Sequence, residues 1–196
     1  MRLMKHSKNK GFSLVELIAS VAIFTIIMSV ILVKHSEFSG TLAVENLAYD
    51  IALSIRKAQV FGLSVREFKD GGSNFNVGYG LHFDSSANDS YIFFVDANRN
   101  EKYDDSSEII EVFALNKGNT ISEFCTLVSS SSQKCSVSDI TYLDIIFERP
   151  NPDAIIKSSA VSDLYTSAVI TIASPNGAKW DITTITTGQI SIQRQI

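Results

Sequence analysis

Proline, cysteine and histidine are scarce in this chain of 196 residues, which contains three prolines, two cysteines and three histidines. So few prolines exclude a collagen-like or proline-rich protein. The histidines (His6, His35 and His82) are scattered, and no nucleophile elbow, zinc-protease helix, phosphate loop or dinucleotide fingerprint is found. The sequence therefore gives no support for an enzyme, and His82, which falls on an expected strand, is interpreted as structural.

Basic residues are scarce outside the N-terminus. Residues 1–11 contain four basic residues and no acid, whereas the whole chain has a net charge of −4, so the remainder carries −8. Because an acidic surface repels the phosphate backbone, binding of nucleic acid is disfavoured. The cations of the C-terminal third are too sparse for a basic patch; they are Arg149, Lys157, Lys179 and Arg194.

One long segment lacks charge almost completely. Residues 12–33 read FSLVELIASVAIFTIIMSVILV, and Glu16 is their only charged residue. As a helix this segment would be about 33 Å long, enough to cross the hydrocarbon core of a bilayer. A secretory signal peptide has a shorter apolar region that ends in a small-residue cleavage site, and no such site follows here. With the basic residues before the span, residues 1–11 are expected in the cytoplasm and the rest of the chain outside.

Glu16 is the exception within the apolar segment. A carboxylate inside a membrane span costs about 2.5–3.5 kcal/mol, which favours a partner of opposite charge. Alternatively, Glu16 lies near the cytoplasmic end of the span and reaches the headgroups. The position alone leaves both interpretations open.

The start of the apolar segment carries a motif. The stretch GFSLVELI (residues 11–18), after a short basic leader, resembles the prepilin signature of type IV pilins and type II secretion pseudopilins. The resemblance implies cleavage after Gly11 by a prepilin peptidase and N-methylation of the new Phe12 amine. It also implies an assembly in which Glu16 pairs with the Phe12 amine of a neighbouring subunit. Such a pair requires an axial stagger, which a helical, non-closing assembly supplies.

An amphipathic stretch follows the apolar segment. Apolar residues recur at steps of three and four between Val44 and Ala58, and no proline interrupts residues 12–61. We expect one helix of about 50 residues, with Gly40 as a weak point and Gly62 as its C-terminal cap. The stripe covers about two heptads, so it is expected to pack on the protein's own sheet rather than on a partner helix.

Short strand-like runs begin near residue 77 and are rich in Val, Ile, Thr, Phe and Tyr. Strands are expected at 77–83, 91–96, 109–115, 140–148, 167–173, 179–186 and 189–194. The turn residues at 175–177 and 187–188 predict that the last three strands form a meander. The expected fold class is α+β, with the long N-terminal helix packed on an antiparallel β-sheet domain. In pattern this layout resembles the GspH/FimT-type minor pseudopilins.

The chain is thus expected to have four parts. These are a leader (1–11) that is removed, a transmembrane or filament-core half of the helix (12–33), an amphipathic half (34–62) and an exported β-rich domain (63–196).

Cys125 and Cys135 are separated by nine residues. Outside the cytoplasm, two cysteines at this distance are expected to form a disulfide that closes a small loop. Two free thiols are the alternative. No third cysteine or nearby histidine completes a metal site.

A polar segment follows the apolar run YIFFV. Its oxygen-bearing residues resemble the start of a calcium loop, and the candidate ligands are Asp96, Asn98, Asn100, Asp104 and Glu108. Glu101 replaces the glycine of that motif, and Glu108 lies one residue late. The alternative is a polar loop whose Asp and Asn side chains bond to their own backbone. No cofactor is expected to be required, and calcium would stiffen the loop.

The expected function is that of a structural subunit, of the minor type, in a type IV pilus or type II secretion pseudopilus. Its expected partners are other pilin or pseudopilin subunits, the prepilin peptidase/N-methyltransferase, the inner-membrane assembly platform and, before assembly, membrane lipid. The expected location is the bacterial inner membrane, crossed once, and then a filament outside it. The alternatives are a major pilin, a filament-tip binding module for DNA uptake or adhesion, and a monomeric anchored domain.

Overall fold

The computed structural model describes residues 11–64, 68–69, 73–74, 76–128, 133–160 and 165–195. The leader before Gly11 lies outside the described residues. The chain divides into two compact units, Met1–Ser39 and Gly40–Ile196, and each is described by itself.

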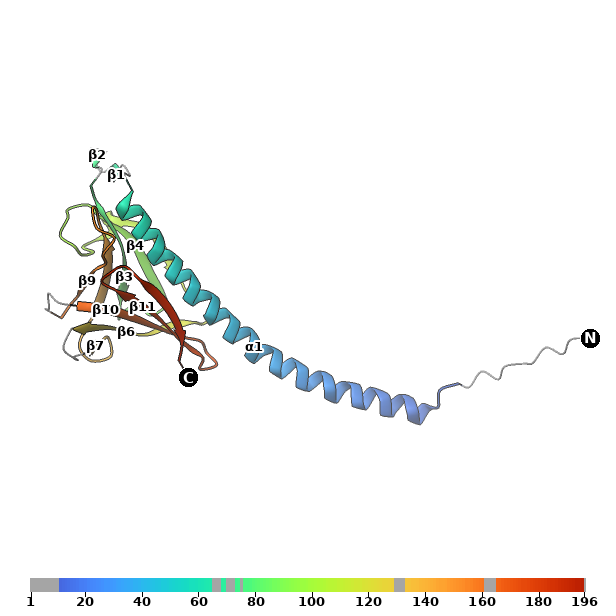
Figure 1. Cartoon of the computed structure of the whole chain (residues 1–196). Coiled ribbons are helices and arrows are strands. Elements are labelled where there is room, and N and C mark those ends of the chain that lie inside the picture. The colour runs from blue at the N-terminus through green and yellow to red at the C-terminus, as the bar shows by residue number, and fades with distance from the viewer. Residues whose placement is uncertain are drawn as a thin grey trace, which may run out of the picture. The chain divides into compact units, whose positions relative to one another are not determined.

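The expected single helix is confirmed. Helix α1 (Leu14–Leu63) contains 50 residues and carries no proline (Figure 1). Ser13 caps its N-terminus, because the Ser13 hydroxyl accepts a hydrogen bond from the Glu16 amide at 3.2 Å. The helix continues through Gly40, so the expected weak point does not interrupt it.

Gly62 is not a cap beyond the helix but a buried residue inside it, so that expectation is wrong. A Cβ atom at this position would lie 2.1 Å from the carbonyl oxygen of Phe147, at the end of strand β8 (Tyr142–Phe147). The glycine is therefore required by the close approach of α1 to that strand rather than by a left-handed backbone.

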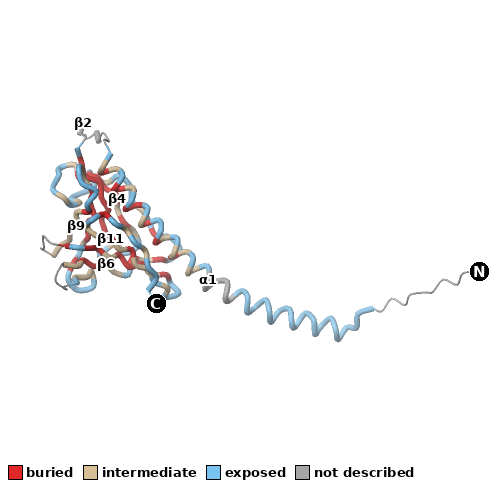
Figure 2. Tube along the Cα trace, in the orientation of Figure 1, coloured by how far each residue is buried: buried red, intermediate tan, exposed pale blue. Residues whose placement is uncertain are grey.

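The first unit contains the apolar part of α1. Residues Leu14–Leu32 form a helix that is long and apolar enough to cross a membrane, and none of this span is buried within the chain. Figure 2 shows the same stretch as uniformly exposed. Its large side chains are therefore available to lipid or to other protein molecules.

The second unit contains two five-stranded antiparallel sheets. The strand order of the first sheet is β5-β4-β3-β8-β9, and that of the second is β12-β11-β10-β6-β7. The first sheet comprises β3 (Gly78–Asp84), β4 (Ser90–Asp96), β5 (Ile109–Ala114), β8 and β9 (Ile155–Ser158). The second comprises β6 (Thr120–Val128), β7 (Gln133–Cys135), β10 (Tyr165–Ala173), β11 (Lys179–Ile185) and β12 (Ile190–Arg194). A short pair, β1 (Phe68–Lys69) and β2 (Ser73–Asn74), follows α1.

All seven expected strands are present, and the last three form the expected meander β10-β11-β12. Strands β1, β2, β6, β7 and β9 were not expected from the sequence. Strand β6 lies inside the second sheet, between β7 and β10, so the missed strand is one that joins the meander to the rest of the domain. The α+β class is confirmed.

The core lies between α1 and the two sheets. Five residues of the predicted apolar stripe are completely buried, namely Val44, Ala48, Ile51, Ile55 and Ala58, and its other two, Leu47 and Ala52, are partly buried. They form one cluster with side chains of both sheets, including Phe93 and Ile145 from the first and Phe124 and Ile170 from the second. The stripe packs on the protein's own sheets, as expected, and burial of these side chains stabilises the domain.

Candidate functional site

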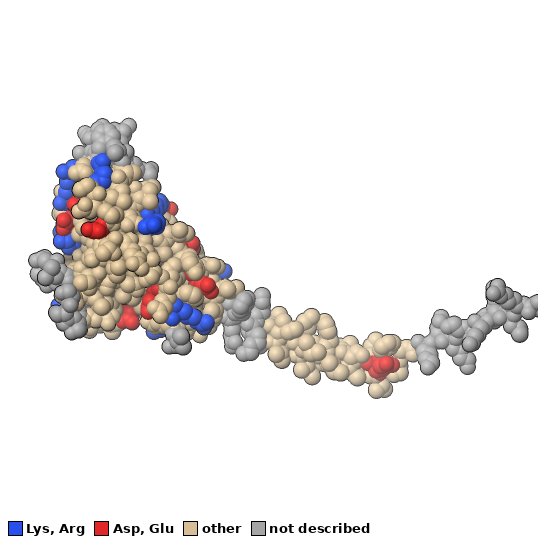
Figure 3. Space-filling view, in the orientation of Figure 1, with Lys and Arg blue, Asp and Glu red and all other residues tan. Residues whose placement is uncertain are grey.

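The N-terminal motif begins on exposed chain and continues into α1. Gly11 has no atom near the position where a Cβ would stand, and Phe12 is 72% exposed. In the described part of the chain, no hydrogen bond or ion pair reaches the Glu16 carboxylate. In Figure 3 this apolar stretch shows one acidic group, and Glu16 is the acid that the sequence places there.

The other polar side chains of the span bond to their own helix. The hydroxyls of Ser20, Thr25 and Ser29 donate to the carbonyls of Glu16, Ala22 and Thr25 at 2.7, 2.9 and 2.8 Å. Hydroxyl groups satisfied in this way can enter an apolar environment at low cost. Within the described span, Glu16 is therefore the polar side chain for which the described part of the chain provides no partner.

The candidate calcium residues extend from the last residue of β4, Asp96, to the residue before β5, Glu108. Asp96 is fully buried, and its two carboxylate oxygens accept hydrogen bonds from the amides of Asn100 (3.0 Å) and Glu101 (2.9 Å). Glu108 is also buried and accepts from the amides of Ala97 (3.2 Å) and Asp104 (3.0 Å). Burial raises the pKa of the Glu108 carboxyl. These two carboxylates, one at each end of the segment, together hold four backbone amides of the loop.

The middle of the loop is closed by Asp104. The amide groups of Asn98 and Asn100 both donate to this carboxylate, the former at 2.6 Å, and the Lys102 ammonium lies 2.7 Å from it. The hydrogen bond from Lys102 holds the pKa of Asp104 below its usual value. The five predicted residues thus lie in one loop, where they bond to one another and to the backbone. This is the arrangement of the polar-loop alternative.

A calcium site is not shown, and calcium stays a prediction. Among the described residues, the one group of acidic, histidine or cysteine ligand atoms close enough to share a metal ion is Glu123, Cys125 and Cys135. The two sulfur atoms of that group are bonded to each other, so neither is a thiolate that binds metal.

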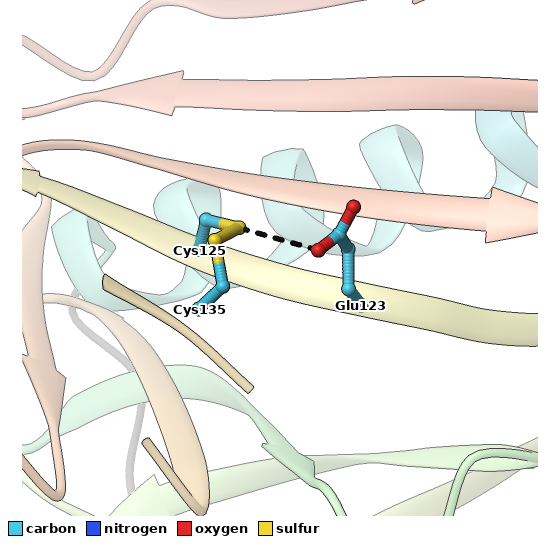
Figure 4. Close-up of side chains that lie close together, drawn as sticks. All are labelled: Glu123, Cys125 and Cys135. Atoms are coloured by element: carbon cyan, nitrogen blue, oxygen red, sulfur yellow. Dashed lines mark hydrogen bonds between the residues drawn. A yellow bond between two sulfur atoms is a disulfide. The ribbon is translucent and has the colours of Figure 1, made fainter. Parts of the chain in front are cut away.

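The expected disulfide is present in the structure. Cys125 on β6 and Cys135 on β7 are joined, and the two residues are direct partners in the antiparallel pair β6–β7 (Figure 4). A carboxylate oxygen of Glu123 lies 3.9 Å from the Cys125 sulfur. The bond therefore ties the edge strand β7 to its neighbour β6.

The sequence analysis identified His82 as structural but did not predict that it pairs with Asp144. The Nδ1 atom of His82 on β3 lies 2.6 Å from a carboxylate oxygen of Asp144 on β8, and burial raises the pKa of Asp144. The other oxygen of Asp144 accepts from the Tyr103 amide at 3.2 Å, and the Tyr103 ring lies 4.5 Å from the His82 ring. The pair thus fastens the loop between β4 and β5 to the sheet, which agrees with a structural role for His82.

Comparison with known proteins gives one match. Residues 6–32 match the family described as the prokaryotic N-terminal methylation motif, which is the prepilin signature of type IV pilins. No curated protein and no solved structure matches the chain. The match covers the exposed helix and the Gly11-Phe12 junction but no part of the β domain. The chain thus carries the N-terminal methylation motif of the type IV pilins on a membrane-capable helix.

Proposed function

We propose that this protein is a minor structural subunit of a type IV pilus or of a type II secretion pseudopilus. The observation that carries the proposal is that the matched motif continues into an apolar helix whose side chains are not buried by any described part of the chain. A helix of this kind rests in lipid before assembly and packs on other helices afterwards. The β-rich layout, similar in pattern to the GspH/FimT-type minor pseudopilins, supports the minor rather than the major class.

In this proposal the chain is cleaved after Gly11, and the new Phe12 amine is methylated. The span crosses the inner membrane once, with the leader in the cytoplasm and the β domain outside. Glu16 then pairs with the Phe12 ammonium of a neighbouring subunit. This ammonium is the positively charged partner that the described part of its own chain does not provide. The chemistry of processing belongs to the peptidase, and the role of this chain is mechanical.

Mass spectrometry of the protein from membranes of its native host tests the processing. The expected mature chain begins at Phe12 and carries the mass of one added methyl group. A mature chain that retains residues 1–11 would contradict the proposal and favour a plain membrane anchor.

The assembly step is tested separately with Glu16→Ala. This variant is expected to be processed normally but to be lost from sheared filament fractions. The reason is that the Phe12 ammonium of the neighbouring subunit then has no carboxylate to pair with. Ser20→Ala is the matched control, since it removes a polar group one turn further along the same helix without changing charge. If Glu16→Ala enters filaments to the same extent as the wild type does, the pairing is refuted.

A further inference from the structure

Helix α1 and the turn between β5 and β6 border a polar cleft that the proposed function does not use. Its volume is about 470 Å³, which is in the range of pockets that hold small ligands. Its polar lining comes from both sides, with Asn46 and Asp50 on α1 and Asn116, Lys117 and Asn119 on the turn. Both sides belong to the second unit of the chain.

Two opposite charges line this cleft without pairing with each other. Within the described part of the chain, no ion pair or hydrogen bond reaches the Asp50 carboxylate or the Lys117 ammonium. Nearby charges do pair, since the Lys57 ammonium lies 2.9 Å from a carboxylate oxygen of Glu111. The cleft therefore offers one carboxylate and one ammonium to a ligand that carries both complementary charges.

The turn holds Lys117 in a backbone conformation that a lysine rarely adopts. Its φ is 62°, in the left-handed region, and Gly118 follows with a φ of 72°. The Asn119 amide donates to the Asn116 carbonyl at 3.3 Å and closes the turn. Such conformations are costly and are concentrated at binding and catalytic sites. Here the conformation places a cation in the lining of the cleft.

Amide side chains supply the neutral polar groups of the cleft. Asn119 is 5% exposed, and its Nδ2 donates to the Asn116 carbonyl at 2.9 Å, but its Oδ1 accepts no hydrogen bond from the described residues. An unpaired buried acceptor is unfavourable, and an N–H group of a ligand would satisfy it. Because an amide side chain both donates and accepts, Asn46 and Asn116 are matched in the same way to a peptide group.

The rest of the lining is neutral and partly apolar. The Tyr91 hydroxyl lies 2.9 Å from the Ser54 hydroxyl, and burial raises the pKa of Tyr91 to about 12, so this phenol adds no charge. The ring of Phe113 stacks on that of Tyr91 with 5.0 Å between the centroids, and Leu47 lines the cleft from α1. The cleft thus offers apolar contact as well as two charges.

We propose that this cleft binds a di- or tripeptide with free ends, whose ammonium pairs with Asp50 and whose carboxylate pairs with Lys117. A neutral sugar would leave both charges unpaired, and the end of a protein chain would satisfy only one of them. A short peptide also brings N–H groups to Asn119 and a side chain to the apolar lining. This binding activity goes beyond the subunit role and does not depend on it.

Calorimetry with the full-length protein in a non-ionic polyoxyethylene detergent tests the proposal, with glycylglycyl-leucine as the probe. We expect a Kd of about 0.1–1 mM, which is typical of a ligand of this size. The N-acetylated and the C-amidated forms of the probe each lack one charge. Each is expected to bind about fivefold more weakly than the unmodified peptide.

Two variants assign the charges to residues. Asp50→Asn is expected to weaken binding of the unmodified peptide about fivefold and to leave binding of the acetylated peptide unchanged, because that peptide has no ammonium. Lys117→Gln should have the corresponding effect on the unmodified but not on the amidated peptide. Asp153→Asn and Lys179→Gln, at exposed positions outside the cleft, are the matched controls and should bind as the wild type does. All four unfolding midpoints should stay within about 2 °C of the wild type.

Three results would overturn the proposal. The first is the absence of binding at about 10 mM peptide, well above the expected Kd. The second is equal affinity for the unmodified peptide and for one blocked at both ends, since recognition would then not involve the charges. The third is unchanged binding by Asp50→Asn and Lys117→Gln, which would place the peptide elsewhere. None of these results bears on the subunit role, which the processing and Glu16→Ala experiments test.

Discussion

At the scale of single residues, the buried carboxylates of the domain hold loops in place by accepting hydrogen bonds from the backbone. Asp96 illustrates this, because both of its carboxylate oxygens accept backbone hydrogen bonds and no side-chain cation contacts it among the described residues. Such a carboxylate holds the backbone in the middle of the loop. Glu108 acts in the same way on the amides of Ala97, at the start of the loop, and of Asp104.

Asp96→Asn is therefore expected to destabilise the domain by about 2–3 kcal/mol, because one carboxylate oxygen becomes an amide that cannot accept a hydrogen bond. Thermal or urea unfolding measures the change. Asp89→Asn, at an exposed position, is the control and should remain within about 0.5 kcal/mol of the wild type.

The same unfolding curves, recorded with calcium and with a chelator, test the calcium prediction. A higher midpoint with calcium supports a metal site, and equal midpoints support the polar loop.

The carboxylate beside the disulfide has a measurable consequence. Reduction begins when an external thiolate attacks one sulfur and expels the other as a thiolate, so negative charge develops next to Glu123. At 3.9 Å from the Cys125 sulfur, a charge interaction of about 1 kcal/mol in water corresponds to a rate effect of about fivefold. Glu123→Gln is expected to be reduced by dithiothreitol faster than the wild type by about this factor. The difference should shrink in 1 M salt, and an unchanged rate at low salt would contradict it.

At the scale of elements, two glycines of α1 differ in how much room they leave for a side chain. A Cβ at Gly62 would collide with the backbone of Phe147, whereas a Cβ at Gly40 would meet only the end of the Asn176 side chain, at 2.8 Å. Backbone cannot move without separating α1 from the first sheet, but a side-chain amide can turn away. Gly62→Ala is therefore expected to destabilise the domain by about 3 kcal/mol or more.

Gly40→Ala serves as the partner experiment in the same helix. It is expected to be neutral or to stabilise the protein by up to about 1 kcal/mol, because alanine favours the helix over glycine. Chemical unfolding of the two variants side by side measures both effects. Equal destabilisation by both substitutions would show that the contact with Phe147 is not the reason for Gly62.

Sequence patterns predicted those elements whose signal is local. The helix follows from an apolar run and a three-to-four periodicity, and the strands of the meander from β-branched residues between clear turns. Strand β6 was missed because its sequence, TISEFCTLV, mixes a charge and a cysteine into the run, and the cysteine pair was interpreted as a loop. Its identity as a strand depends on its neighbours β7 and β10, which a single segment does not reveal.

The candidate site shows the same difference between features with a local sequence signal and features that depend on the folded domain. The motif at Gly11, Phe12 and Glu16 was found because its residues are close in the sequence. The pairing of His82 with Asp144 depends on the register between β3 and β8, which the sequence alone does not fix. The exposed apolar residues of α1 (Leu42, Tyr49, Leu53 and Val60) were also missed as a group, although their spacing is visible in the sequence. What distinguishes it is exposure, and exposure is a property of the folded domain.

At the scale of the whole molecule, carboxyl groups that are buried or half-buried are expected to govern the pH dependence of stability. Burial is the main cause that raises the pKa of Glu108, Asp144 and Glu148 above the ordinary values. A carboxyl group whose pKa is higher in the folded chain binds its proton more tightly there than in the unfolded chain. Its effect on folding is therefore unfavourable at neutral pH and is relieved as the pH falls through the raised pKa.

Two exposed groups act in the opposite sense at lower pH. Hydrogen bonds from Lys102 and from Ser107 lower the pKa values of Asp104 and Asp105, so their contribution is lost only below the ordinary aspartate value of about 4. Because both are exposed, solvent screening keeps this contribution small. The thermal unfolding midpoint is therefore expected to rise from pH 7 to about pH 5 and to fall again below about pH 4. Glu148→Gln should reduce the rise, since the amide does not titrate, whereas a midpoint that falls steadily from pH 7 to pH 5 would contradict the assignment.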